Sequence, residues 1–183
     1  MSEQNPWTIL ESKKIYANKW ISLTEHQVLN PSSGGKGIYG EVHFENYAIG
    51  IIAIDEQDHI YMVGQYRFPL KQYSWELPEG GGTLDGNPLD AAKRELLEET
   101  GLVAQNWKEL MRMHLSNSVS DELGIIYLAT DFTQFEPEPE ESEQLEVKRM
   151  PFEDVYQMVI RGEITDSLTV AGILRAKLLR AGF

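Results

Sequence analysis

The feature that most constrains this chain is a glycine-rich stretch followed by an acidic helix pattern, GGGTLDGNPLDAAKRELLEETGL, over residues 80–102. The four glycines among its first seven residues predict a flexible loop that other groups can approach closely. Asn87 is a favourable N-cap, Pro88 suits the first helical position, and Gly101 is a typical C-terminal stop. The stretch therefore predicts a loop that leads into a helix starting at Pro88 and stopping before Gly101.

Three glutamates of this expected helix, Glu95, Glu98 and Glu99, are spaced to share one face. Like charges at this spacing destabilise an isolated helix by roughly 0.2–0.5 kcal/mol per pair. An acidic face of this kind is most often simply solvated. Beside a glycine loop, however, several carboxylates also form the oxygen-rich site that a hard divalent cation such as Mg²⁺ prefers.

The segment RELLEETGL, residues 94–102, resembles the second half of the Nudix box, G-x5-E-x7-R-E-U-x-E-E-x-G-U, in which U is a bulky aliphatic residue. Gly80 stands at the opening glycine of that pattern, but Gly86 stands where the pattern has its first glutamate. In the family that glutamate supports the box arginine and does not bind the metal. Its absence raises the question of how Arg94 is held, and Asp85 is a candidate replacement.

The resemblance implies a metal site in which Glu95, Glu98 and Glu99 are the carboxylate ligands and Glu79 adds its backbone carbonyl. The implied ion is Mg²⁺, with Mn²⁺ as a substitute. Glu98 is also a candidate for activating the attacking water.

The segment before the box, QYRFPLKQYSWELPEG over residues 65–80, resembles the same region of ADP-ribose pyrophosphatase-like members of the family. The resemblance implies that Arg67 clamps the diphosphate of the substrate, as a guanidinium fork can, and that Glu76 also belongs to the substrate site. The alternative for Arg67 is a surface ion pair. Trp20 is a candidate for stacking a nucleobase, although its neighbours Ile21 and Leu23 favour a place in the core.

An acidic segment with two prolines, EPEPEESEQLE over residues 136–146, predicts a loop. In ADP-ribose pyrophosphatase-like relatives such a loop carries a catalytic glutamate. We expect Glu141 to be the general base and Glu143 to be an additional metal ligand, and the two roles could be exchanged. The alternative is a solvated connector with no part in the chemistry.

The order along the chain is strands, one helix, strands and then helices, without an internal repeat, which indicates an α+β fold. Residues 47–55 and 59–67 are expected to form a hairpin around a polar turn. The resemblance implies the Nudix fold, an α/β/α sandwich with a mixed sheet and an additional N-terminal antiparallel sheet. We expect residues 1–44 to be a dimerisation and base-binding extension of the Nudix hydrolase domain, residues 45–183. Further strands are expected at residues 7–16, 20–29, 38–44, 107–115, 124–130 and 145–150, and further helices at 152–161 and 167–179.

Composition narrows the classes of function. The net charge of −13 argues against a nucleic-acid partner, because that affinity relies on clustered Lys and Arg. There is no cysteine, hence no disulfide and no zinc–thiolate site. We see neither a signal peptide nor an apolar run long enough for a membrane span, so a cytoplasmic enzyme without a membrane partner is expected.

Together these features predict a Mg²⁺-dependent hydrolase acting on ADP-ribose or another nucleoside diphosphate sugar, with a nucleoside monophosphate and a sugar phosphate as products. The resemblance further implies a homodimer formed through the N-terminal strands. One alternative is another Nudix substrate class, a dinucleoside polyphosphate or an oxidised nucleoside triphosphate. The other is a catalytically inactive domain that senses nucleotide sugars.

Overall fold

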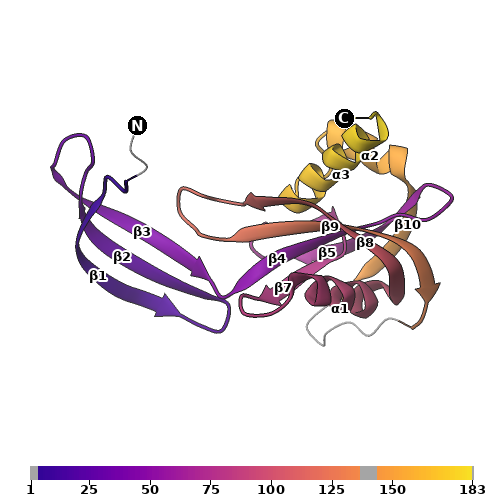
Figure 1. Cartoon of the computed structure of the whole chain (residues 1–183), viewed down its shortest axis with the longest axis horizontal. Coiled ribbons are helices and arrows are strands. Elements are labelled where there is room, and N and C mark those ends of the chain that lie inside the picture. Colours follow the sequence, from indigo (N-terminus) through magenta and orange to yellow (C-terminus); the bar gives the residue numbers. More distant parts are fainter. Residues whose placement is uncertain (1–3, 137–143, 183) are drawn as a thin grey trace. The chain divides into compact units, whose positions relative to one another are not determined.

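The computed structural model describes residues 4–136 and 144–182. The chain divides into two compact units, each described by itself below (Figure 1). The first unit comprises Met1–Asn46 and His114–Glu122, and the second comprises Tyr47–Met113 and Leu123–Phe183.

The first unit is built on a three-stranded antiparallel sheet in the order β1-β2-β3. Its strands are β1 (Thr8–Ala17), β2 (Ile21–Leu29) and β3 (Lys36–Phe44). Asn18 makes the first turn, because its side-chain oxygen accepts hydrogen bonds from the backbone N–H groups of Trp20 and Ile21 at 2.8 and 2.9 Å. The expected N-terminal antiparallel sheet is therefore present.

The second unit contains two sheets between layers of helices (Figure 1). One sheet has the order β7-β4-β9-β8, in which β4 and β9 run parallel, and the other has the antiparallel order β10-β5-β6. Helix α1 lies on one side of these sheets, and α2 and α3 lie on the other. The α+β class and the α/β/α sandwich are confirmed. The elements are β4 (Asn46–Ala53), β5 (His59–Arg67), β6 (Gln72–Glu76), β7 (Glu79–Thr83), α1 (Pro88–Thr100), β8 (Leu102–His114), β9 (Leu123–Gln134), β10 (Glu146–Pro151), α2 (Phe152–Ile160) and α3 (Ser167–Arg180).

Helix α1 begins and ends where the sequence predicts. The Asn87 side chain accepts a hydrogen bond from the Leu89 N–H at 3.1 Å. Gly101 ends the helix in the left-handed conformation, with φ 72°, which glycine adopts without steric cost. The helix buries Leu96 completely in the core cluster that also contains Ile49 and Ile125. Burial of one such leucine contributes about 1.5–3 kcal/mol, so the box helix is fixed firmly on the sheet.

Two expectations about strands are wrong. Strands β4 and β5 do not form a hairpin but belong to different sheets, and only an isolated bridge between Ile54 and Ile60 joins their ends. The apolar run of β4 is buried in the sheet beside β9, as is usual for parallel strands. The glycines at residues 80–82 form part of strand β7 and not a loop, because β7 pairs at the edge of the same sheet.

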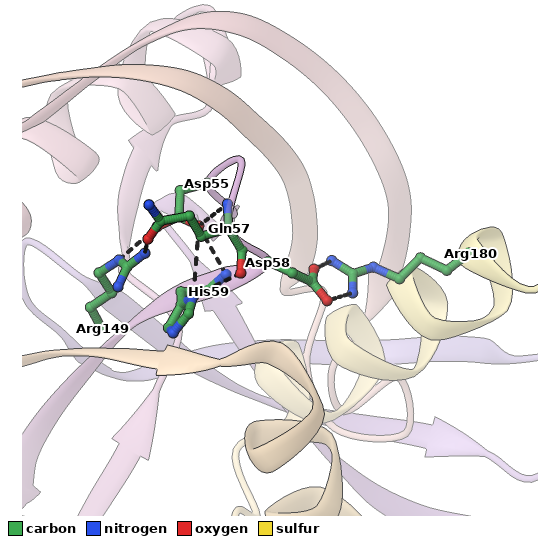
Figure 2. A network of polar contacts seen from close by, with 6 residues as sticks. All are labelled: Asp55, Gln57, Asp58, His59, Arg149 and Arg180. Atoms are coloured by element: carbon green, nitrogen blue, oxygen red, sulfur yellow. Dashed lines mark hydrogen bonds and ion pairs between the residues drawn. The ribbon is translucent and has the colours of Figure 1, made fainter.

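The polar turn expected at residues 55–58 is present and is held by two arginines (Figure 2). Arg149 of β10 donates to the Asp55 carboxylate and to the Gln57 side chain, both at 2.6 Å. Arg180, at the end of α3, forms a two-pronged ion pair with Asp58. These contacts connect the turn to β10 and to the last turn of α3.

No helix within residues 4–136 and 144–182 is long and apolar enough to cross a membrane.

Candidate active site

Strand β7 holds the glutamates of α1 against its backbone. Glu95 and Glu99 are 9% and 2% exposed. The Glu99 carboxylate accepts a hydrogen bond from the backbone N–H of Glu79 at 2.9 Å. The Glu95 carboxylate occupies the space where a Cβ on residue 80 would lie, so any residue other than glycine would displace this carboxylate. This cradle explains why a glycine opens the motif.

Arg94 is held without the first glutamate of the box. Its guanidinium donates to Glu98 at 2.7 Å, to Glu95 at 2.6 Å and to the carbonyl oxygen of Gly81 at 2.8 Å. Burial alone would lower the pKa of Arg94, but the two glutamates raise it above its ordinary value. Asp85 is not among its partners in the described part of the chain, so the expectation that Asp85 replaces the missing glutamate finds no support.

The donor set of this face fits a hard divalent cation. Glu95, Glu98 and Glu99 stand at positions i, i+3 and i+4 of a rigid helix, and the cradle at Gly80 places the Glu95 carboxylate beside the β7 backbone. Magnesium prefers such ligands and keeps part of its water shell, which a partly exposed site allows. The residues present therefore suit the metal that the sequence motif implies.

On the other side of β7, Arg67 forms ion pairs with the largely buried carboxylates of Glu76 and Glu79. Its Nε atom donates to both Glu76 oxygens, at 3.0 and 2.9 Å, and its Nη2 atom forms a further ion pair with Glu79. The side chains of Glu76 and Glu79 are only 3% and 11% exposed, and that of Arg67 is 35% exposed. Burial would lower the pKa of Arg67, but the neighbouring carboxylates raise it, so the arginine remains charged.

This cluster contains more negative than positive charge. A carboxylate oxygen of Asp166, at the start of α3, lies within 4.8 Å of oxygens of Glu76 and Glu79. One oxygen of Glu79, Oε2, is buried and has no hydrogen-bond partner among the described residues. Burial, together with Asp166 and Glu76, raises the pKa of Glu79 well above its usual range, although Arg67 acts in the opposite direction.

The structure thus brings together residues that the sequence assigned separately. Arg67 and Glu76 were expected in the substrate site, and Glu79 was expected to contribute its carbonyl to the metal site; here both glutamate side chains hold Arg67. The ion pair expected as the alternative for Arg67 exists, and about a third of the arginine side chain is still accessible. Its role in phosphate binding stays a prediction, and a contribution of Glu76 would act through Arg67.

Sequence reasoning missed Asp166 and Thr169. Asp166 is the N-cap of α3, and its carboxylate accepts a hydrogen bond from the Thr169 N–H at 2.7 Å. The short pattern of an aspartate before a helix could have identified the cap. Its proximity to Glu76 and Glu79 depends on tertiary packing and left no local signal.

Of the three remaining expected site residues, the structure describes Trp20. Trp20 belongs to the first unit, is 51% exposed and carries the Lys19 ammonium 4.3 Å from its ring centroid. It is not a core residue, and its exposed ring is compatible with stacking. Glu141 and Glu143 fall outside the described residues, so their roles stay predictions.

Known proteins match this chain over almost its whole length. The family model described as "NUDIX domain" matches residues 45–168, and that of the "Nucleoside diphosphate sugar hydrolase N-terminal domain" matches residues 7–41. An ADP-ribose pyrophosphatase of Mycobacterium tuberculosis is 32% identical over 98% of this chain and 87% of its own length. One of Bacillus subtilis is 29% identical over 94% of this chain and 93% of its own. The crystal structure of an ADP compounds hydrolase superposes with a TM-score of 0.86, covering 100% of this chain and 98% of that one at 20% identity, which supports the fold.

Proposed function

Because the chain belongs to the Nudix family, we propose that it hydrolyses the P–O–P bond of ADP-ribose or another nucleoside diphosphate sugar. The products are a nucleoside monophosphate and a sugar phosphate. The observation that carries the proposal is the strand β7, which holds the Glu95 and Glu99 carboxylates through Gly80 and the Glu79 N–H, and holds Arg67 through the Glu79 side chain.

The substrate class rests on further support. Two relatives matched over 94% or more of this chain are named ADP-ribose pyrophosphatases. The N-terminal match concerns a domain of nucleoside diphosphate sugar hydrolases. Within this proposal, residues 45–183 form the hydrolase domain and residues 1–44 are its extension, in which Trp20 stacks the base.

Glu95, Glu98, Glu99 and the backbone carbonyl of Glu79 would hold Mg²⁺, or Mn²⁺ in its place. When bound, the ion would polarise phosphate oxygens and lower the pKa of a water molecule. The net charge of −13 does not argue against a phosphorylated substrate, because a bound cation reverses the local charge of the site.

The residues of the chain supply the remaining steps. Arg67 binds the diphosphate, and Glu76 and Glu79 set the direction of its guanidinium. A carboxylate oxygen of Glu141 takes the proton from water as the new O–P bond forms and the bridging P–O bond breaks. Glu143 either binds the metal or is itself the base in place of Glu141. Glu98 is a further candidate for the base.

We further propose that the enzyme is a homodimer formed through the first unit. Strand β1 pairs only with β2 among the described strands, which leaves a free edge. Large apolar side chains are exposed on it, including Ile9 at 55% and Ile15 at 49%. Proteins tend to cover such edges and patches. Multi-angle light scattering should give the mass of two chains, and a single species of 20.9 kDa would contradict the dimer.

A panel of substrates tests the proposed function. The purified chain is incubated with Mg²⁺ and with ADP-ribose, several nucleoside diphosphate sugars, a dinucleoside polyphosphate and an oxidised nucleoside triphosphate. A coupled phosphatase then releases phosphate from the monoester products. For the triphosphate, whose own terminal phosphate the phosphatase would attack, released pyrophosphate is measured instead. We expect the highest kcat/KM for a nucleoside diphosphate sugar. A higher value for either of the other two classes would contradict the substrate class. Binding without hydrolysis in every case would indicate a sensor domain.

A further inference from the structure

The two-residue connector between β6 and β7, Leu77 and Pro78, carries the chain from one sheet to the other. Its polar backbone atoms therefore need partners outside their own strands. The Pro78 carbonyl accepts a hydrogen bond from the Ile51 N–H of β4 at 2.9 Å. The Leu77 N–H donates to the side-chain hydroxyl of Thr169 on α3, also at 2.9 Å. The connector is thus fastened on one side by a strand and on the other by a helix 92 residues away in sequence.

Thr169 has no access to solvent, and its position is tightly defined. Its backbone N–H donates to the Asp166 cap, so the hydroxyl projects from the first turn of α3, where the helix is firmly anchored. Helix α3 also approaches the connector closely through Gly172, where a Cβ would lie 3.2 Å from the Leu77 side chain and 3.1 Å from that of Ile52. The helix and the connector therefore have little freedom to shift relative to each other.

The residues on either side of the connector both reach Arg67. Glu76 precedes it and Glu79 follows it, and their carboxylates are the two ion-pair partners of the arginine. The N–H of Glu79 also binds the box glutamate Glu99. A displacement of the connector would therefore move the partners of Arg67 relative to the box.

We propose that Thr169 is a positioning residue for the substrate: by holding the Leu77 N–H, it fixes Glu76 and Glu79 and through them the direction of the Arg67 guanidinium. The inference rests on the proposed function, in which Arg67 binds the diphosphate. The hydroxyl of Thr169 binds the connector, whereas its backbone N–H binds Asp166 and is kept in every substitution, so removal of the hydroxyl acts on the site through the connector.

Thr169→Val tests this, because valine keeps the shape and removes the acceptor, which leaves a buried N–H unpaired. We expect KM for the best nucleoside diphosphate sugar to rise about 5- to 10-fold, the effect of one lost hydrogen bond, with a smaller change in kcat. Thr169→Ser keeps the hydroxyl and should restore KM. Ile173→Val, a fully buried position on the same helix, is the matched control for a loss of packing alone and should leave KM unchanged.

A double-mutant cycle separates positioning from general destabilisation. If Thr169 acts through Arg67, Thr169→Val should raise KM much less in an Arg67→Lys background than in the wild type. An equal rise in both backgrounds, or a Thr169→Val KM no higher than that of Ile173→Val, overturns the proposal. If Thr169→Val does not fold, Thr169→Cys, whose thiol is a weaker hydrogen-bonding group, takes its place with the same expected outcomes.

A measurement without substrate makes the inference independent of the enzyme's activity. The Nε–H signal of Arg67 in a ¹⁵N NMR spectrum, assigned by its loss in Arg67→Lys, reports the ion pair with Glu76 directly. Thr169→Val should shift this signal and accelerate its exchange with solvent, whereas Thr169→Ser and Ile173→Val should not. An unchanged signal in Thr169→Val refutes the positioning role. Absence of nucleotide-sugar hydrolysis by the wild type would refute the proposed function instead.

Discussion

Replacing Gly80 by alanine should abolish most activity while sparing the fold. A Cβ at this position would overlap the carboxylate of Glu95, which is the end of a flexible side chain and can therefore rotate away. Rotation costs about 0.5–1.5 kcal/mol if it forces an unfavourable rotamer. It also gives up the contact between Glu95 and Arg94, which is worth up to about 1 kcal/mol for a pair that is partly solvated.

Part of this loss is offset, because alanine in place of glycine inside a strand raises the free energy of unfolding by roughly 0.5–1 kcal/mol. The net loss in free energy of unfolding is therefore about 1 kcal/mol, a fall in Tm of about 2–4 °C for a chain of this size. Displacing one carboxylate from the metal face should cost turnover far more. Removal of a preorganised electrostatic group typically lowers kcat about 100- to 1000-fold.

The assay compares kcat at saturating Mg²⁺, the Mg²⁺ concentration for half-maximal activity and the thermal unfolding curve. Gly40→Ala is the control, because a Cβ there would meet nothing within 4 Å. It should match the wild type in kcat and in Mg²⁺ dependence, and its Tm should be slightly higher, because residue 40 lies inside β3 and gains the same roughly 0.5–1 kcal/mol. A Gly80→Ala enzyme with kcat and Mg²⁺ dependence close to the wild-type values would refute the role of the cradle. A large fall in Tm would refute the estimate of stability.

Four further substitutions test the assigned roles. Glu99→Gln keeps an oxygen that can accept the hydrogen bond from the Glu79 N–H but removes the charge. The variant should fold normally, bind Mg²⁺ more weakly and have a kcat at least about 100-fold lower. Near-normal turnover at saturating Mg²⁺ would exclude Glu99 as a ligand. Arg67→Lys keeps the charge but loses the planar guanidinium fork, so KM for an intact nucleotide sugar should rise with little change in Mg²⁺ dependence. An unchanged KM would mean that Arg67 is only a structural ion-pair residue. Glu141→Gln should lower kcat with KM nearly constant, whereas Glu143→Gln should alter the Mg²⁺ dependence. The reverse pattern would exchange their roles, and full activity of the double variant would exclude both.

The sequence predicted local structure better than strand pairing. Helix α1 was placed correctly because its caps, Asn87 and Gly101, act within a few residues of each end. The pairing of β4 was predicted wrongly because an apolar strand can satisfy its hydrogen bonds with any suitable neighbour, and β9 is far away in sequence. The glycines of β7 predict a loop because glycine disfavours strands, but here Gly80 is needed for the close approach of Glu95.

The candidate site also has a part that the local sequence predicts and a part that depends on tertiary packing. The acidic face of α1 follows from helical periodicity, and its resemblance to a known motif identified the metal ligands that we propose. The convergence of Glu76, Glu79 and Asp166 on one side of β7 was not predicted, because these residues come from the β6–β7 connection and the start of α3. The bond between Leu77 and Thr169 joins positions 92 residues apart and has no counterpart in local sequence.

The most direct test of the central claim is a ³¹P NMR spectrum of ADP-ribose incubated with the purified chain, with Mg²⁺ present and then with excess chelator. Hydrolysis of the P–O–P bond predicts that the two diphosphate signals disappear and two phosphomonoester signals, from AMP and ribose 5-phosphate, grow in equal amounts only when Mg²⁺ is present. If ADP-ribose is not the preferred substrate, the same spectrum is recorded with the best nucleotide sugar of the panel. Diphosphate signals that persist with every nucleotide sugar, or equal rates in the presence of chelator, would contradict the claim.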